Sequence, residues 1–335
     1  MRAVVIREFN NPDAVNLEEV SNLIPGAHEV VVDACACSVN YTDWMSLDGS
    51  YQNIPGLPFT PGKDSCGIVS AIGSKVTRHK VGGRVIAHVN DAGLAEQVVC
   101  HEDMTFPIPD GLSFEDAAGI GLSYMTAWFA VMDRGQLQTG HNIIVTGASG
   151  GVGMAAVNIA RAMGADTVFG AISNMEKADA VREAGADAVV DLSAGDLKNG
   201  IRDQVRAVTG GPLCNVAVEM IGGEAFEGSL RALQPEGRIV VCGFVSGKVP
   251  TARANYLLVK HIGLIGMTMA APFGARSPKV AEAQAKLFDL AVEGKITPRI
   301  SACYPLEDYL KAIHLLGERK IVGKAILTMG SREKG

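Results

Sequence analysis

Membrane-spanning and strongly basic segments are absent from this sequence. It contains no run of about 18 uncharged apolar residues, so we expect no transmembrane helix. Lys and Arg form no cluster, and the net charge is −6, which argues against a nucleic-acid or anionic-lipid partner. The opening segment MRAVVIREF is too short and too soon charged to be a signal peptide. Together these absences predict a cytoplasmic protein.

Cysteine is scarce and scattered. The seven cysteines lie at positions 35, 37, 66, 100, 214, 242 and 303. We interpret them as small buried thiols in a reducing compartment rather than as disulfides. Cys35 and Cys37 form a C-x-C pattern that invites comparison with a metal site. They lie two apart on an expected strand, so their side chains share one face, and we interpret both as core residues.

The length of 335 residues is more than one hydrophobic core usually supports, which predicts two domains. Residues 1–122 alternate short apolar runs with Gly, Pro, Asn and Asp, which is typical of a mostly β domain. Residues 123–269 alternate strand-like and helix-like segments, including an expected helix at 224–237. This alternation indicates an α/β domain with a doubly wound parallel sheet. We expect residues from about 270 to 335 to return to the first domain.

The most specific motif is the glycine turn VTGASGGVGMAA at 145–156. Its residues Gly151, Gly153 and Ala156 fit the pattern G-x-G-x-x-G/A at the point where a strand leads into a helix. Such a helix N-terminus offers free N–H groups and a positive dipole end to a pyrophosphate. We therefore expect Rossmann-type dinucleotide binding by the segment Gly150, Gly151, Val152 and Gly153.

The end of the second strand of this domain indicates which dinucleotide binds. An NAD site usually places Asp or Glu there to hold the ribose 2′-hydroxyl, whereas this chain has the sequence AISN at 171–174. Ser173 and Lys177 can instead donate hydrogen bonds to a 2′-phosphate, which favours NADP(H). The alternative for Lys177 is a solvated lysine in the first turn of a helix. We assign Glu176 to the start of that helix.

Several further segments carry a resemblance to a known family. These are SVNYTDW (38–44), PFTPGKDSCGIVSAIG (58–73), VGGRVIAH (81–88), GLSYMTAWFAV (121–131), GASGGVG (147–153) and CGFVSGKVPTARANYLLVKHIGLIG (242–266). In this order they resemble the medium-chain dehydrogenase/reductase superfamily, and within it the zinc-free quinone oxidoreductase branch that includes zeta-crystallin. The resemblance implies a GroES-like N-terminal catalytic domain beside the Rossmann domain.

The resemblance also bears on metal binding. Zinc-dependent alcohol dehydrogenases of the superfamily hold a Cys and a His at positions that correspond to Asn40 and Lys63. An ammonium is no ligand and an amide is a poor one for zinc. The four-cysteine structural zinc loop is missing as well, since no Cys occurs between Cys66 and Cys100. We therefore predict that the protein holds no metal.

Asn40, Tyr41, Asp43 and Lys63 then become the candidate catalytic residues. The Asn40 amide and the Tyr41 hydroxyl are candidates for hydrogen bonds to a substrate carbonyl, and Lys63 for stabilising a developing oxyanion. Asp43 is expected to order the site. The alternatives are that Lys63 is neutralised by Asp64 or Asp43 and that Tyr41 packs against the cofactor.

The resemblance adds cofactor candidates, which are Thr126, Gly243, Phe244 and Arg319, with Lys324 as a less specific one. Some relatives carry a Tyr near the third strand of the Rossmann domain, where this chain has Asp191 and Leu192. Binding of a 2′-phosphate would then depend mainly on Ser173 and Lys177.

These observations together predict a zinc-independent, NADPH-dependent oxidoreductase. It would reduce quinones or α,β-unsaturated carbonyls, small-molecule substrates, by hydride transfer. The alternatives are an enoyl-CoA or acryloyl-type reductase and a non-catalytic, crystallin-like NADPH-binding protein. Pairing of the apolar segment 261–269 with a second copy predicts a homodimer, with a homotetramer as the alternative.

Overall fold

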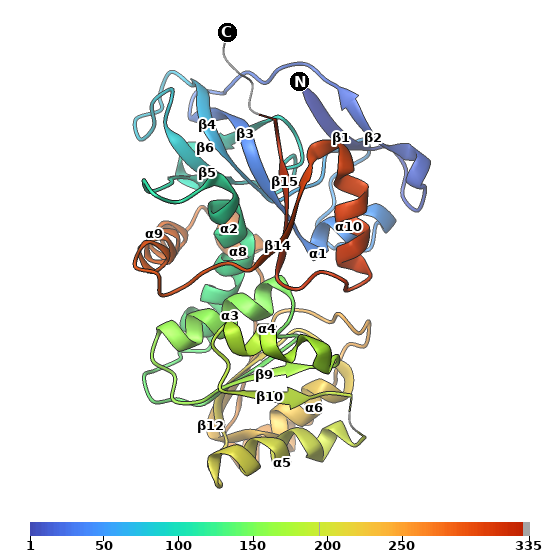
Figure 1. The fold of residues 1–335 in the computed structure, drawn as a ribbon, viewed down its shortest axis with the longest axis vertical. Helices are drawn as coiled ribbons and strands as arrows, with labels where there is room; N and C mark the ends of the chain where they lie inside the picture. Colours follow the sequence, from blue (N-terminus) through green and yellow to red (C-terminus); the bar gives the residue numbers. More distant parts are fainter. Residues whose placement is uncertain (194, 331–335) are drawn as a thin grey trace. The chain divides into compact units, whose positions relative to one another are not determined.

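The computed structural model describes residues 1–193 and 195–330, apart from the side chain of Pro12. The chain forms two compact units (Figure 1). The first comprises residues 1–125, 270–293 and the segment that begins at 298, and the second comprises residues 126–269 and 294–297. The first strand and the last described strand therefore both belong to the first unit.

The first unit is built on a seven-stranded sheet with the order β14-β15-β3-β4-β5-β7, in which β6 also pairs with β3. Its long central strand is β3 (Glu29–Val39), which pairs antiparallel with β4 (Asp64–Ile72), β6 (Gln97–His101) and β15 (Lys324–Thr328). The C-terminal strand thus lies directly beside the strand that leads into the Asn40 segment. The other strands of the unit are β1 (Arg2–Ile6), β2 (Val15–Glu19), β5 (Arg84–His88), β7 (Thr105–Pro107) and β14 (Ile300–Pro305).

Five α-helices accompany this sheet in the described part of the chain. Helix α1 (Tyr41–Asp48) contacts α10 (Tyr309–Gly317), and both border a core that contains Val4, Cys37 and Leu327. The other helices are α2 (Phe114–Trp128), which continues into the second unit, α8 (Ala270–Gly274) and α9 (Pro278–Val292). Short 3-10 helices occur at Pro12–Ala14, Glu102–Met104 and Leu306–Asp308.

The second unit contains a six-stranded, fully parallel sheet with the order β10-β9-β8-β11-β12-β13. The chain runs outward from β8 to β10, returns to β11 beside β8, and then runs outward in the opposite direction. The strand order therefore reverses between β8 and β11, where doubly wound sheets bind their ligands. The strands are β8 (Ile143–Thr146), β9 (Val168–Ile172), β10 (Ala188–Asp191), β11 (Cys214–Glu219), β12 (Leu233–Val241) and β13 (Gly263–Gly266).

Helices α3 and α4 lie on one face of this sheet, and α5 and α6 lie on the other (Figure 1). Phe169, Ile201 and Phe226 fill the core between the sheet and α5 and α6. The helices are α3 (Gly151–Ala162), α4 (Ala178–Glu183), α5 (Leu197–Thr209), α6 (Gly223–Arg231) and α7 (Ala254–Lys260), with a π-helix at Phe129–Arg134 and a 3-10 helix at Met175–Lys177.

The predicted doubly wound parallel sheet is confirmed, but one predicted helix extends too far and one helix was not predicted. The helix expected at 224–237 ends at Arg231, and β12 already begins at Leu233. Helix α1 lies in a region interpreted as β. It begins after Asn40, whose backbone is extended, and ends before Gly49, which has a left-handed φ of 78°. Asn before a helix and Gly after it are common end signals that a strand-only interpretation passes over.

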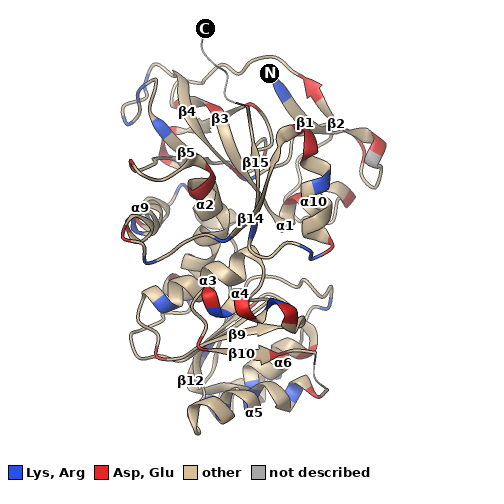
Figure 2. Cartoon of the chain, in the orientation of Figure 1, with Lys and Arg blue, Asp and Glu red and all other residues tan. Residues whose placement is uncertain are grey.

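Lys and Arg are interspersed with Asp and Glu in both units rather than gathered in one broad stripe (Figure 2). Among the residues that the structure describes, none of the helices has both the length and the apolar character needed to cross a membrane.

Candidate functional site

Two of the four candidate catalytic residues, Asn40 and Asp43, are hydrogen-bonded to each other at the turn from β3 into α1. The backbone N–H of Asn40 donates to Asp43 Oδ2 at 2.7 Å, and the N–H of Gly62 donates to Asp43 Oδ1 at 3.1 Å. One carboxylate therefore joins the start of α1 to the segment just before Lys63. Asp43 is fully buried, and both of its carboxylate oxygens accept hydrogen bonds from these backbone segments.

Burial has a large effect on the Asp43 carboxyl group. Loss of solvation raises the pKa of Asp43 from its ordinary value of 3.8 to about 6. The hydrogen bond from the Asn40 N–H and the positive charges of Lys63 and Lys324 oppose this increase, while Asp64 adds to it.

The Asn40 side chain is committed to partners inside the protein. Its Oδ1 accepts a hydrogen bond from Lys324 Nζ at 2.8 Å, and its Nδ2 donates to Ser38 O at 3.1 Å and to Ser38 Oγ at 3.0 Å. The residue is only 6% exposed. The geometry therefore gives the Asn40 amide a supporting position under the turn.

Lys324 is a buried cation that sequence reasoning placed only among the less specific cofactor candidates. Its Nζ also donates to Val39 O at 2.9 Å, and no carboxylate lies within ion-pair distance of it in the described part of the chain. Burial lowers the pKa of Lys324, and the charges of Asp64 and Asp43 oppose that effect. Ser38 Oγ donates to Asp64 Oδ1 at 2.7 Å, so a hydrogen-bonded chain runs from Lys324 through Asn40 and Ser38 to Asp64.

Lys63 forms an ion pair, but not with the partners considered from the sequence. Its Nζ lies 3.2 Å from Asp91 Oδ1, donates to Asn90 O, and lies 4.8 Å from the centre of the Tyr51 ring. The alternative considered for Lys63, an ion pair with Asp64 or Asp43, was therefore wrong as to the partner. The signal that was missed is the acidic loop at Asn90 and Asp91, which lies far from Lys63 in the sequence.

Tyr41 differs from the other three candidates. It is the first residue of α1 and is half-buried, and its hydroxyl makes no hydrogen bond with any residue that the structure describes. It is therefore the member of the group whose polar atom stays available to a substrate.

Asn40 and Lys63 stand where the family resemblance implies zinc ligands in relatives, and both side chains have protein partners. Within the described residues, no group of three or more His, Cys, Asp or Glu side chains is arranged to hold a metal ion. Of the two cysteines that drew attention in the sequence, Cys37 lies in the core as predicted, whereas Cys35 is only partly buried.

In the second unit, the glycine turn connects β8 to α3 as the motif requires. Gly147 has a left-handed φ of 64°, and the residue preceding α3 is Gly150, which has no side chain to cap the first turn. A Cβ on Gly153 would lie 2.2 Å from Gly147 O, so glycine is needed there for close packing of helix and turn. The N–H groups of Gly151 and Val152 begin a helix of 12 residues, and such an N-terminus fits a phosphate.

The other nucleotide candidates lie in two places. Ser173 and Lys177 follow β9, and Asn174 between them accepts a hydrogen bond from the Glu176 N–H at 3.0 Å, which supports the assignment of Glu176 to the helix start. Gly243 and Phe244 follow β12 at the carboxyl edge of the sheet, and Phe244 is 40% exposed. Thr126 belongs to the second unit and Arg319 to the first.

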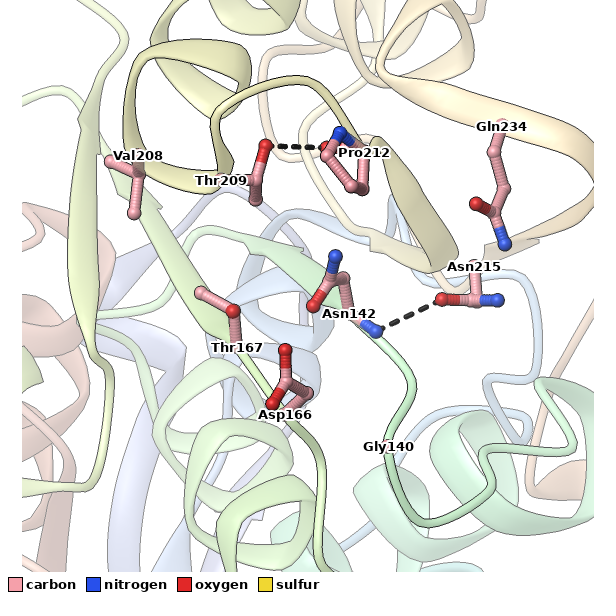
Figure 3. A pocket seen from close by; sticks show the side chains of 9 residues that line it. All are labelled: Gly140, Asn142, Asp166, Thr167, Val208, Thr209, Pro212, Asn215 and Gln234. Carbon is pink, nitrogen blue, oxygen red and sulfur yellow. Dashed lines mark hydrogen bonds between the residues drawn. The ribbon is translucent and has the colours of Figure 1, made fainter.

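A recess of about 540 Å³ lies at the opposite, amino edge of this sheet (Figure 3). Asn142 and Thr167 stand just before β8 and β9, and the Asn142 N–H donates to Asn215 Oδ1 at 2.9 Å. The full lining is Gly140, Asn142, Asp166, Thr167, Val208, Thr209, Pro212, Asn215 and Gln234. Because doubly wound sheets bind nucleotides at their carboxyl edge, this recess is separate from the nucleotide site.

Known proteins are similar to this chain in sequence and fold over nearly its whole length. Residues 26–110 match the family described as alcohol dehydrogenase GroES-like domain, and residues 151–286 match the family described as zinc-binding dehydrogenase. The chain is 34% identical to quinone oxidoreductase-like protein 2 of Rattus norvegicus over 328 residues, which cover 98% of this chain and 92% of the relative. The chain belongs to the medium-chain dehydrogenase/reductase superfamily.

Within the superfamily, it lies in the quinone oxidoreductase-like branch. It is 31% identical to the quinone oxidoreductase of Mus musculus, with 98% of both chains covered. The solved structure of Escherichia coli quinone oxidoreductase complexed with NADPH is similar, with a TM-score of 0.89 and 26% identity, and the match covers 98% of this chain and all of that one. These matches confirm the predicted family and the predicted pairing of a Rossmann sheet with a GroES-like domain.

The raised pKa of Asp43 predicts a defined dependence of stability on pH. The folded state binds the Asp43 proton more tightly than the unfolded state does. The stabilisation of the folded state by this proton is therefore complete below pH 3.8 and is lost as the pH rises through about 6. The interval corresponds to roughly 3 kcal/mol. Urea denaturation of the wild type and of Asp43→Asn should therefore give a difference in unfolding free energy that falls between about pH 4 and about pH 7.

Asp196→Asn provides the matched control. The hydrogen bond from the Asn199 side chain lowers the pKa of this exposed carboxyl group, so its contribution is lost as the pH falls, which is the opposite sign. A wild-type-minus-Asp43→Asn difference that stays constant or rises over the same interval would contradict the account of Asp43.

Proposed function

We propose that this protein is a zinc-independent, NADPH-dependent oxidoreductase that reduces quinones or α,β-unsaturated carbonyls. The observation that carries the proposal is the replacement of the two zinc-ligand positions by Asn40 and Lys63, each held by protein partners, beside a Tyr41 hydroxyl without one. Such a site is suited to hydrogen bonding of an oxygen rather than to metal chemistry. The names of the relatives in mouse and Escherichia coli support the same activity.

The described residues of the second unit fit NADPH. The uncapped first turn of α3, with Gly150, Gly151, Val152 and Gly153, receives the pyrophosphate, and Ser173 and Lys177 receive the 2′-phosphate. Gly243 and Phe244 border the same edge, and the family resemblance also assigns Thr126 of this unit. It further assigns Arg319, which belongs to the first unit. The bound cofactor supplies the hydride.

The first unit supplies orientation and charge stabilisation. Tyr41 donates a hydrogen bond to the carbonyl oxygen of the acceptor, where negative charge develops during reduction. Asn40 and Asp43 hold Tyr41 in place, since they fix the backbone at the start of α1. Lys63 contributes positive charge that Asp91 partly offsets.

Turnover of a panel of acceptors tests the proposal. In metal-free buffer with a chelator, the wild type should oxidise NADPH with a simple quinone or an enone, and crotonyl-CoA tests the enoyl-thioester alternative. Tyr41→Phe should lower kcat roughly tenfold to hundredfold, because one donor to the developing oxyanion is lost. Tyr304→Phe, the same change on β14, is the control and should leave kcat unchanged.

Two results would count against this reading. Stoichiometric zinc with loss of activity on chelation would exclude zinc independence. NADPH binding without turnover of any acceptor would favour the non-catalytic alternative.

Coenzyme preference provides a second prediction. Removal of Lys177 or Ser173 takes away a donor to the 2′-phosphate, which NADH lacks. Lys177→Ala and Ser173→Ala should each lower kcat/KM for NADPH roughly tenfold and leave kcat/KM for NADH nearly unchanged. Lys198→Ala is a matched control, because Lys198 lies on α5 and pairs with Glu227 at 2.8 Å. An equal loss with both coenzymes would refute the assigned role.

We further propose that the protein forms a homodimer through β13. This strand is the edge of the parallel sheet, with Leu264 42% exposed, and the adjacent helix α7 exposes Leu258 at 76% and Val259 at 78%. Apolar side chains beside an unpaired sheet edge suit pairing with a second copy.

Sedimentation equilibrium measures this assembly. The wild type should sediment above its chain mass of 35.1 kDa, and Leu258→Glu should shift it toward the monomer. Val208→Glu, at an apolar position on α5 that is 54% exposed, should leave the assembly intact. A monomeric wild type would rule the proposal out, and a homotetramer would require a second contact besides β13.

A further inference from the structure

A buried carboxylate stands at the carboxyl edge of the parallel sheet, in a position that the reaction chemistry does not use. Glu219 is the last residue of β11 and is fully buried. β11 and β8 are the strands between which the order of the sheet reverses. The carboxylate therefore lies under the edge where the glycine turn begins.

Three donors, from the end of β8 and from the loop after β11, make four hydrogen bonds to this carboxylate. Glu219 Oε1 accepts hydrogen bonds from Thr146 Oγ1 at 3.1 Å, from the Ile221 N–H at 3.0 Å and from the Gly222 N–H at 3.1 Å. Oε2 accepts from the Gly222 N–H at 3.1 Å. Thr146 is the last residue of β8, directly before Gly147. The side chain thus joins the start of the glycine turn to the loop between β11 and α6.

A third loop contacts the junction formed by the Glu219 side chain, Thr146 and the β11–α6 loop. The loop after β12 begins with the Cys242 N–H donating to Glu219 O at 2.8 Å. It continues with the Val245 and Ser246 N–H groups donating to Met220 O at 2.9 Å and to Ile221 O at 3.0 Å. This loop carries Gly243 and Phe244. The two segments assigned to NADPH binding here, the glycine turn and the β12 loop, are therefore connected through Glu219 and the β11–α6 loop.

The junction leaves little room for rearrangement. A Cβ on Gly222 would lie 2.3 Å from Lys248 O, so the β11–α6 loop and the β12 loop are in close contact. Loss of solvation raises the pKa of Glu219, and the hydrogen bonds from Gly222, Ile221 and Thr146 oppose that increase. Burying a carboxylate costs free energy of folding, and a protein with an apolar residue of similar size in its place is often at least as stable. Stability by itself is therefore a weak reason for a carboxylate at this position.

We infer that Glu219 is a positioning residue for the dinucleotide, because it holds the glycine turn, the β11–α6 loop and the β12 loop at the spacing that the cofactor requires. The inference rests on the proposed NADPH-dependent function. Glu219 acts through the backbone of these loops and does not itself touch the cofactor.

The test is NADPH affinity, measured by titration of nicotinamide fluorescence with the full-length protein. Glu219→Ala removes all four acceptor contacts and should weaken NADPH binding roughly tenfold to hundredfold. Glu219→Gln keeps one acceptor oxygen and should show a smaller loss. In steady state, KM for NADPH should rise while kcat at saturating NADPH and KM for the quinone stay nearly constant, as expected for lost binding alone.

A second pair of variants keeps the test decisive if Glu219→Ala fails to fold. Thr146→Val removes the hydroxyl that donates to Glu219 Oε1, and Thr146→Ser retains it. The Val variant should weaken NADPH binding severalfold, and the Ser variant should restore the wild-type affinity. Asp187→Asn is the control, because Asp187 Oδ2 accepts from the Val168 N–H at 2.8 Å at the amino edge of the same sheet. It should lower the melting temperature without changing NADPH affinity.

The outcomes separate this inference from the proposed function. A wild type that does not bind NADPH overturns both. A wild type that binds NADPH, with Glu219→Gln and Thr146→Val variants that melt earlier but bind with unchanged affinity, overturns the positioning role alone.

Discussion

The hydrogen bonds of the Lys324 ammonium hold the end of β3 and the start of α1, the segment that carries Tyr41. Lys324 begins the C-terminal strand β15, and its Nζ donates to Val39 O and Asn40 Oδ1 at the end of β3. Asn40 then fixes the entry to α1, and Asp43 joins that entry to Gly62. The placement of Tyr41 therefore depends on residues nearly 300 positions apart in the sequence.

Both units bury a charged group whose direct hydrogen-bond partners are neutral. In the first unit, carbonyl oxygens accept from Lys324, and in the second, backbone N–H groups and a hydroxyl donate to Glu219. Removing any one of these partners leaves a buried group unsatisfied, so such arrangements tolerate little distortion. That rigidity suits sites whose loops must keep fixed positions relative to a ligand.

The sequence predicted the features that local patterns encode. The glycine turn at 145–156 and the strand–helix alternation after it predicted the parallel sheet, and family motifs predicted the superfamily. Element ends were less predictable. Residues 233–237 were expected to extend the helix, but Leu233 pairs with Cys214 of β11, and after an irregularity Arg238 pairs with Val216. Pro235 and Gly237 are poor helix formers, so the helix ends early.

By itself, the sequence determined that no Asp or Glu directly ends the second strand of the Rossmann sheet, and through the family resemblance it predicted Asn40 and Lys63 at the zinc-ligand positions. It could not show the hydrogen-bond and ion-pair partners of these side chains. Only the tertiary structure paired Lys63 with Asp91, placed Lys324 under Asn40 and gathered three loops around Glu219. The reason is physical, since a buried polar group must bond whatever the fold brings within about 3 Å, and those neighbours come from distant segments.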